Sequence, residues 1–215
     1  MMTVSRKSIL KQAQQNDYVA YSPEGDFYLN LRGKYDYMEA PYFTSQELEA
    51  AGLIVFPSCK EMLDSYIVPI IMEKAKTSGI AIPSYYISNG YFEPPVIIDP
   101  INPFMIRSRT VLSANNIERI AKSMTRNFTY AVCCQEIPPG AKIKKFRSVL
   151  GWSRQKQFRE LASQIWGIFK MPLAKVRVIV TTENEILLSD ISHLPFEDLN
   201  EQELNHLLQE VRWEK

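Results

Sequence analysis

The chain has 215 residues, enough for one large domain or for two small lobes that share a core. Hydrophobic residues make up 46% of it and charged residues 23%, and these proportions exclude a disordered protein. The formal net charge is +1, and no apolar run approaches the roughly 20 residues of a membrane-spanning helix.

The first lobe is expected over residues 1–82 and contains a βαβ pattern. Residues 18–22 and 27–31 have the composition of two strands joined by a turn. The string Thr44-Ser45-Gln46-Glu47 has the form of a capping box, which predicts Thr44 as the N-cap of a short helix. The apolar residues 53–56 follow as a strand. A strand, a helix and a second strand in this order favour a parallel βαβ unit.

Two further helices are predicted before the first lobe ends. Ser58 is placed to cap a helix that runs to Tyr66. Pro69 then kinks this helix or starts a new one, because proline is tolerated only in the first turn of a helix. The new helix is expected to end at Gly79.

The second lobe is expected over residues 83–215 and combines an antiparallel sheet with packed helices. Apolar residues alternate in some of its segments and recur at helical spacing in others, which distinguishes strands from helices. The predicted strands are residues 95–100, 128–135, 142–150, 176–180 and 186–188, and the predicted helices are residues 117–124, 154–170 and 199–213. The predicted fold class is therefore α/β (α+β), with a small βαβ N-terminal lobe before a larger mixed lobe.

The nearly neutral total conceals a segregation of charge along the chain. Residues 101–176 contain 14 basic and 3 acidic side chains, whereas the segments on both sides are acidic. Such a segment creates a strong positive field unless the fold places acidic residues against it. Two interpretations stay open: an anionic partner, such as a nucleotide or a nucleic acid, or internal salt bridges to the acidic C-terminal part of the chain.

The three cysteines, Cys59, Cys133 and Cys134, do not form the pattern of a disulfide framework. Cys133 and Cys134 follow an apolar run, so we interpret them as small buried strand residues; zinc would need further ligands at close spacing. A low cysteine count and an N-terminus without the apolar centre of a signal peptide predict a cytoplasmic protein.

Four short strings stand in order along the chain: Pro95-Val96-Ile97-Ile98-Asp99-Pro100, Gln135-Glu136-Ile137-Pro138, residues 140–151 and residues 176–195. Together they resemble ATP-grasp ligases, most nearly those of the RimK type that join amino acids to carboxylates. The first string lies where that family has a strand ending in a nucleotide-contacting lysine. The second resembles the hinge strand whose backbone holds adenine. The first lobe is similar to the small α/β domain that precedes the nucleotide-binding part.

The last two strings carry further family positions. Arg147 stands at the place of a frequent arginine. The segment Asp190-Ile191-Ser192-His193-Leu194-Pro195 resembles the metal-binding end of the family. In that resemblance Asp190 takes the place of a glutamate that binds magnesium, and Ser192 takes the place of an asparagine.

The sequence departs from the family at several charged positions. Asp99 stands where the lysine belongs, and a carboxylate repels the triphosphate that a lysine attracts. Arg177 occupies the place of an acidic residue, and Ser192 is a poorer metal ligand than asparagine. Residues 102–109 lack the glycines of a loop that closes over phosphate. The resemblance therefore implies a truncated, degenerate member of the family, a pseudoenzyme with no expected catalytic residue.

The resemblance and the charge pattern predict three sets of binding residues. The predicted nucleotide-binding residues are Gln135, Glu136, Ile137 and Arg147. The predicted anion-binding residues are Arg107, Arg109, Lys142, Lys144 and Lys145. Asp190 is the one candidate metal ligand, and the implied cofactor is ATP or ADP with Mg²⁺.

Three functions follow from these features. The favoured one is a non-catalytic protein that acts by binding, either as a scaffold for a protein partner or as a regulator that senses a nucleotide or another anionic ligand. The second is an active ATP-dependent carboxylate–amine ligase in which arginine and lysine side chains replace the missing lysine. The third is nucleic-acid binding through the basic segment 101–176, with Phe146 and Trp152 interleaved for stacking on bases.

Overall fold

The computed structural model describes residues 5–37, 39–65, 67–101 and 108–213, and it divides the chain into two compact units. Unit 1 consists of Met1–Leu63, Phe146–Lys175 and Ser192–Lys215. Unit 2 consists of Asp64–Lys145 and Val176–Ile191. The lobe boundary predicted between residues 82 and 83 lies within the first segment of unit 2. The two units are not successive stretches of sequence, because the chain returns to each unit after leaving it.

Unit 1 contains the βαβ pattern that the sequence predicts. Strand β2 (Tyr28–Asn30) pairs antiparallel with β1 (Val19–Tyr21) and parallel with β3 (Val55–Phe56), and helix α2 (Ala40–Ala50) connects β2 to β3. Helix α1 (Arg6–Gln15) precedes this sheet and was not predicted, because only Ile9 and Ala13 of its ten residues are buried. The parallel pairing of β2 with β3 confirms the predicted unit.

The prediction that Thr44 caps this helix is wrong. Helix α2 begins at Ala40, with Glu39 as its N-cap and Pro41 in its first turn. Proline is favoured there because its fixed φ suits a helix and its missing N–H has no partner to lose. Thr44 lies inside the helix, where its Oγ1 donates to the carbonyl oxygen of Ala40 at 3.1 Å.

The next two helices begin where the sequence places them. Helix α3 (Cys59–Ser65) starts with a reciprocal cap, in which the Ser58 N–H donates to Glu61 Oε2 at 2.7 Å and the Glu61 N–H donates to Ser58 Oγ at 3.2 Å. Helix α4 (Val68–Thr77) is a separate helix with proline in its first turn. Gly79 follows it with φ +80°, a conformation that glycine adopts without strain.

Unit 2 is built on a four-stranded antiparallel sheet. Its strand order is β4-β7-β5-β6, with bounds of β4 (Tyr85–Ser88), β7 (Val132–Glu136), β5 (Val96–Pro100) and β6 (Arg109–Val111). Val96, Ile98 and Cys134 face helix α5 (Ile117–Met124) and pack in one buried cluster with Met124. Side chains alternate between the faces of a sheet, so Ile97, Asp99 and Gln135 share the opposite face.

Strand β7 begins four residues later than the predicted start at residue 128. Arg126, Asn127 and Phe128 have φ values of 49°, 57° and 65°, which no strand residue adopts. The buried Thr125 holds this turn, because its Oγ1 accepts the Phe128 N–H at 2.7 Å. The periodicity of apolar residues cannot reveal a turn of this kind, since the hydrogen bonds that hold it, from the N–H groups of Asn127, Phe128, Thr129 and Tyr130, leave no periodic pattern.

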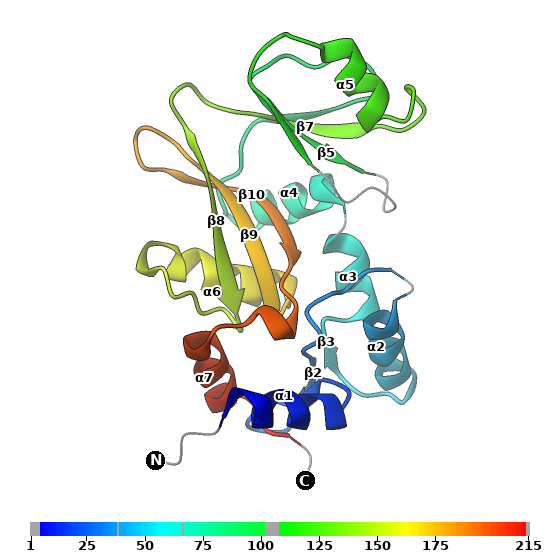
Figure 1. The fold of residues 1–215 in the computed structure, drawn as a ribbon, viewed down its shortest axis with the longest axis vertical. Helices are drawn as coiled ribbons and strands as arrows, with labels where there is room; N and C mark the ends of the chain where they lie inside the picture. The colour runs from blue at the N-terminus through cyan, green and yellow to red at the C-terminus, as the bar shows by residue number, and fades with distance from the viewer. Residues whose placement is uncertain (1–4, 38, 66, 102–107, 214–215) are drawn as a thin grey trace. The chain divides into compact units, whose positions relative to one another are not determined.

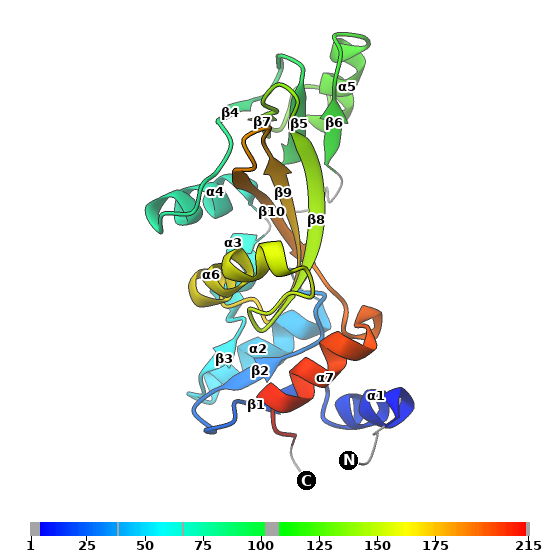
Figure 2. The ribbon, with the colours of Figure 1, turned by 90° about the vertical axis from the view of Figure 1, so that its left-hand side faces the viewer.

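A three-stranded sheet with the order β10-β9-β8 has residues in both units, as Figures 1 and 2 show for its three long strands. Its strands are β8 (Lys142–Val149), β9 (Leu173–Val180) and β10 (Ile186–His193). The remaining helices are α6 (Arg159–Phe169), which a short 3-10 turn precedes, and α7 (Glu201–Glu210). Both are shorter than predicted.

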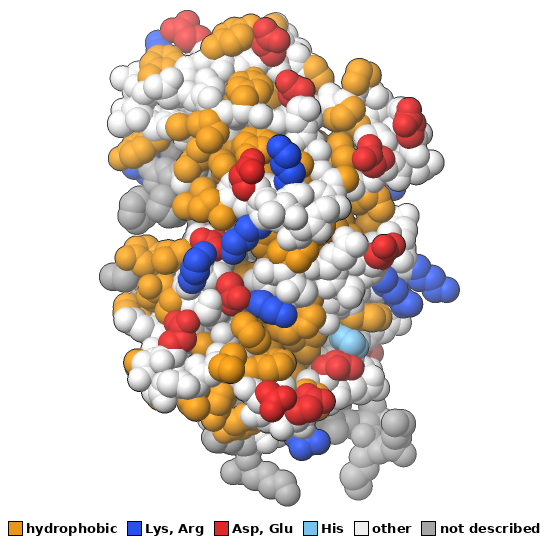
Figure 3. Space-filling model, turned by 180° about the vertical axis from the view of Figure 1, so that it is seen from behind, with side chains coloured by type: hydrophobic (Ala, Val, Ile, Leu, Met, Phe, Trp, Pro, Cys, Tyr) orange, Lys and Arg blue, Asp and Glu red, His pale blue; other side chains and the backbone are white. Residues whose placement is uncertain are grey.

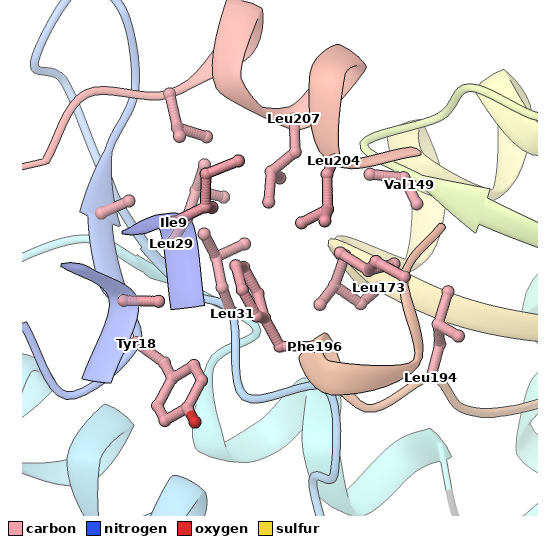
Figure 4. Close-up of a cluster of buried hydrophobic side chains, with 14 residues drawn as sticks. Ile9, Tyr18, Leu29, Leu31, Val149, Leu173, Leu194, Phe196, Leu204 and Leu207 are labelled. Atoms are coloured by element: carbon pink, nitrogen blue, oxygen red, sulfur yellow. The ribbon is translucent and has the colours of Figure 1, made fainter. Parts of the chain in front are cut away.

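The core of unit 1 joins segments from distant parts of the sequence. Fourteen buried residues form it, and Figure 4 shows Leu204 and Leu207 of α7 beside Ile9 of α1 and Phe196. Burying such side chains is the main favourable contribution to folding, about 1.5–3 kcal/mol for each large one. Among the helices that the structure describes, none has the length and apolar composition needed to cross a membrane.

His206 of α7 occupies a partly buried position in unit 1. Its ring lies against the Trp152 ring, with centroids 5.1 Å apart. Burial lowers the pKa of His206, although the Glu210 carboxylate and a hydrogen bond with the Val149 backbone act in the opposite direction. Folding therefore favours the neutral imidazole.

The stability of unit 1 is expected to fall on mild acidification. The unfolded chain takes up a proton at His206 near the ordinary pKa of about 6.5, whereas the folded chain does so only at lower pH. The contribution of neutral His206 to the free energy of unfolding is therefore fully present above about pH 6.5 and is lost as the pH falls below that value. Urea unfolding followed by tryptophan fluorescence should show a smaller loss from about pH 7.5 to about pH 5.5 in His206→Asn than in the wild type.

The matched control is His193→Asn, which removes the other histidine and leaves His206 in place. An identical pH dependence in His206→Asn and in the wild type would contradict the assignment.

Candidate functional site

Four polar side chains are buried together in unit 2. Asp99 and Gln135 come from β5 and β7, and they are 3% and 0% exposed. Arg177 and Ser189 come from β9 and β10, and they are 6% and 0% exposed. These four residues are referred to below as the buried polar network.

Hydrogen bonds connect all four members of the network. Arg177 Nη2 donates to Asp99 Oδ2 at 2.7 Å and forms a salt bridge with it, and Arg177 Nε donates to Ser189 Oγ at 2.7 Å. Gln135 Nε2 donates to the same Asp99 oxygen at 2.7 Å and to the Ser189 carbonyl oxygen at 2.9 Å. One oxygen of Asp99 thus accepts from both a guanidinium and an amide, which makes this carboxylate the centre of the network.

The charge of Arg177 is stabilised by two carboxylates. Burial acts to lower the pKa of this guanidinium, but the negative charges of Asp190 and Asp99 outweigh burial, and its pKa is raised. Asp190, the predicted metal ligand, is half-buried, and its negative charge stabilises the Arg177 guanidinium. A divalent cation bound by Asp190 would therefore have to compete with a guanidinium that is already in place. Across the described parts of the chain, no three His, Cys, Asp or Glu side chains come together as a metal site.

The backbone N–H groups of the predicted hinge strand donate hydrogen bonds to other backbone carbonyl groups. The Glu136 N–H donates to the Ser84 carbonyl oxygen at 2.9 Å, and the Ile137 N–H donates to the Pro95 carbonyl oxygen at 3.1 Å. The Ile137 side chain packs in a buried cluster with Ile97 and two residues of β9 and β10. These two N–H groups are therefore not available to an adenine ring unless the sheet itself opens.

Arg147, the fourth predicted nucleotide-binding residue, lies in unit 1 and has protein partners there. Its Nη1 donates to Glu203 Oε2 at 3.1 Å and to the Asp198 carbonyl oxygen at 3.0 Å. Glu203 is buried and also completes the capping box of α7 with Asn200. The pair matches the alternative in which basic residues form internal salt bridges with the acidic C-terminal segment.

The predicted anion-binding residues that the structure describes lie on two different strands. Arg107 lies outside the described residues, Arg109 is exposed on β6, and Lys142, Lys144 and Lys145 are exposed on β8. On the face shown in Figure 3, lysine and arginine side chains are interspersed with aspartate and glutamate side chains.

The two aromatic residues proposed to stack on nucleic-acid bases have partners inside unit 1. Phe146 is 2% exposed and stacks on Phe158, with centroids 4.6 Å apart. Trp152 contacts the His206 ring. Nucleic-acid binding stays a prediction, and it would have to use the basic side chains without these rings.

Ser192, from the predicted metal-binding end, and the cysteine pair contact other parts of the protein. Ser192 Oγ donates to the Lys175 carbonyl oxygen at 3.1 Å in unit 1. Cys133 and Cys134 are buried and not disulfide-bonded, as predicted. Burial raises the pKa of Cys134 to about 11, so this thiol is neutral at physiological pH.

The sequence identified Asp99 and Arg177 as two separate departures, and it gave no role to Ser189. The signal that could have joined them is the sign of the charges. In the family resemblance, Asp99 stands at a basic position and Arg177 at an acidic one, and two such opposite changes are compatible with an ion pair if the positions are neighbours in space.

A family model described as the RimK-like ATPgrasp N-terminal domain matches residues 102–210. None of the curated proteins compared with the chain matches it significantly.

Several solved structures share the fold. The RimK domain protein ATP-grasp from Sphaerobacter thermophilus has a TM-score of 0.61 and 14% identity, over 96% of this chain and 92% of that one. The D-alanine–D-alanine ligase from Helicobacter pylori has a TM-score of 0.56 and 16% identity, over 77% and 66%. The L-amino acid ligase from Bacillus licheniformis has a TM-score of 0.50 and 10% identity, over 71% and 46%. At these identities the likeness shows a common fold, and the chain spans only part of the last two proteins.

Replacing Asp99 by asparagine should destabilise unit 2 strongly. The substitution keeps the side-chain volume but leaves a buried guanidinium without its nearest counter-charge, which typically lowers the free energy of unfolding by about 3–5 kcal/mol. The double substitution Asp99→Leu with Arg177→Met removes the ion pair and should recover part of this loss, because no guanidinium stays buried without a counter-charge, while Gln135, Ser189 and Asp190 each lose a partner. Hydrogen exchange of the amides in β5 and β7 reports on unit 2 directly.

A matched single substitution, Asp190→Asn, alters the half-buried neighbour and should have a smaller effect. A double variant no more stable than Asp99→Asn would show that the two charges are not coupled.

Proposed function

Because the chain belongs to the RimK-like ATP-grasp N-terminal domain family, we propose that it keeps the ATP-grasp fold without ligation chemistry and acts by binding. The observation that carries this proposal is the buried salt bridge between Asp99 and Arg177. It occupies the positions at which the family resemblance places a phosphate-binding lysine and an acidic residue.

The two charges are opposite in sign to those that ATP-dependent ligation requires. Phosphoryl transfer depends on positioned cations that neutralise the phosphates, and on carboxylates that hold Mg²⁺. Here the position of the lysine carries a carboxylate, which repels phosphate, and the position of the acidic residue carries a guanidinium, which repels Mg²⁺. Since the two groups form a salt bridge with each other, a ligand would have to break it, and separating them would leave the buried Asp99 carboxylate without its counter-charge.

The surroundings of the pair support the same proposal. The N–H groups of Glu136 and Ile137 already donate within the sheet, and Gln135 turns its amide toward Asp99. The residues present therefore do not fit ATP with Mg²⁺. Of the two forms of binding function predicted from the sequence, the geometry favours a scaffold for a protein partner over a nucleotide sensor.

Calorimetric titration of the full chain with ATP, in the presence of Mg²⁺, tests this proposal. No saturable heat is expected at nucleotide concentrations up to about 1 mM, which exceeds the Michaelis constants of most enzymes. Release of ADP in the presence of mixed amino acids should not exceed the rate without protein. The D-alanine–D-alanine ligase, titrated and assayed in the same buffers, is the positive control.

Catalysis would be established by ADP release that depends on an added amino acid and disappears in Asp190→Ala. Saturable binding of ATP without turnover would instead favour the nucleotide sensor.

A further inference from the structure

Unit 1 contains a groove of about 500 Å³ that is remote in sequence from the buried polar network. Its lining residues come from the C-terminal end of α1 and the residues that follow it, from β1 and β2, and from α2. Figures 1 and 2 show where these elements lie in the fold. Its volume lies in the range that holds small ligands or a side chain of a peptide. None of the residues predicted from the sequence to bind a ligand lines it.

The charge of the groove has one sign. Two of its nine lining residues, Asp17 and Glu47, are acidic, and none is basic. The Asp17 carboxylate is held in place by an ion pair with Arg32, which donates to its Oδ1. Glu47 is exposed, and no basic side chain in the described residues forms an ion pair with it. The groove thus offers one carboxylate, Asp17, whose charge Arg32 already compensates, and one, Glu47, that is open to a ligand.

The aromatic surface of the groove comes from two tyrosines on neighbouring strands. Tyr21 and Tyr28 face each other in the β1–β2 register, with ring centroids 4.6 Å apart and planes inclined by 48°. The face of an aromatic ring attracts cations and also packs well against methylene groups. Val19 and Leu48 add apolar surface to the same groove.

We propose that this groove binds a primary ammonium or guanidinium group at the end of an aliphatic stem. The cation would lie between Glu47 and Asp17, and its stem would cover the tyrosine rings. A lysine or arginine side chain of a peptide has this chemistry, and so has a free diamine. The proposal goes beyond the scaffold role and does not depend on it, because no residue of the groove belongs to the buried polar network.

Nuclear magnetic resonance of the ¹⁵N-labelled full chain tests the proposal with defined probes. These are N-acetyl-lysine methylamide, N-acetyl-arginine methylamide and 1,5-diaminopentane, with the uncharged N-acetyl-norleucine methylamide as the control. The cationic probes should cause saturable shifts of the amides of Tyr21, Tyr28 and Thr44. Stronger binding of the two amino-acid probes would identify a peptide side chain as the ligand, and stronger binding of the diamine would identify a free amine.

Substitution of Glu47 measures the contribution of charge. Glu47→Gln keeps the size of this exposed side chain and should weaken binding of the cationic probes about five- to tenfold, since it removes a charge-assisted contact. The control Glu24→Gln changes another exposed acid of unit 1 outside the groove and should leave binding unchanged.

Three results would overturn the proposal. The first is the absence of saturable shifts at the groove amides, and the second is an equal response to norleucine methylamide. The third is an equal loss of affinity in Glu24→Gln and Glu47→Gln. The dispersion of the same spectra shows whether each variant is folded.

Discussion

The salt bridge between Asp99 and Arg177 connects two sheets through a pair of charges that are almost completely shielded from water. Asp99 belongs to the four-stranded sheet of unit 2, and Arg177 belongs to the sheet of long strands. Because isolated buried charges are very unfavourable, each residue fixes the other in place. Gln135 and Ser189 depend on the pair as well, since their polar groups would otherwise be buried beside an unpaired ion. The interior of unit 2 is therefore specified by electrostatics as much as by apolar packing.

This arrangement distinguishes the chain from a family member that has simply lost a catalytic residue. The loss of a lysine alone would leave acidic groups facing each other, and the site would remain suited to a cation. Under the proposed function, the two reversed charges instead form a buried salt bridge with each other, and Asp190 adds a second carboxylate near Arg177. The fold of a ligase can persist under such a change because the packing around Ile97 and Ile137 does not require a nucleotide.

The sequence predicted much of the fold because the relevant signals are local. The βαβ unit, the helix cap at Ser58 and the buried strand around Ile98 depend on residues that are close in the chain. The wrong predictions have a different origin. Thr44 had a suitable pattern, but Pro41 lies in the first turn of a helix that begins earlier, and the hydrogen bonds that hold the turn at Thr125 leave no periodic pattern of apolar residues.

The site was predicted only in pieces for the same reason. Asp99 and Arg177 are 78 residues apart, so the sequence presents them as two separate departures, and only the opposite signs of their charges indicate that they could form a pair. Arg147 was assigned to a nucleotide by its position in the resemblance, whereas its partner Glu203 lies 56 residues further along.

The return of the chain to each unit has a practical consequence. Unit 1 is assembled from three stretches of sequence and unit 2 from two, and β8, β9 and β10 each contribute to both. No single cut releases either unit as a contiguous fragment, and a truncation that goes beyond α1 or α7 and reaches the neighbouring strand removes part of a sheet. Evolution faces the same restriction: neither unit can be transferred to another protein by a simple insertion, so the two must be inherited together.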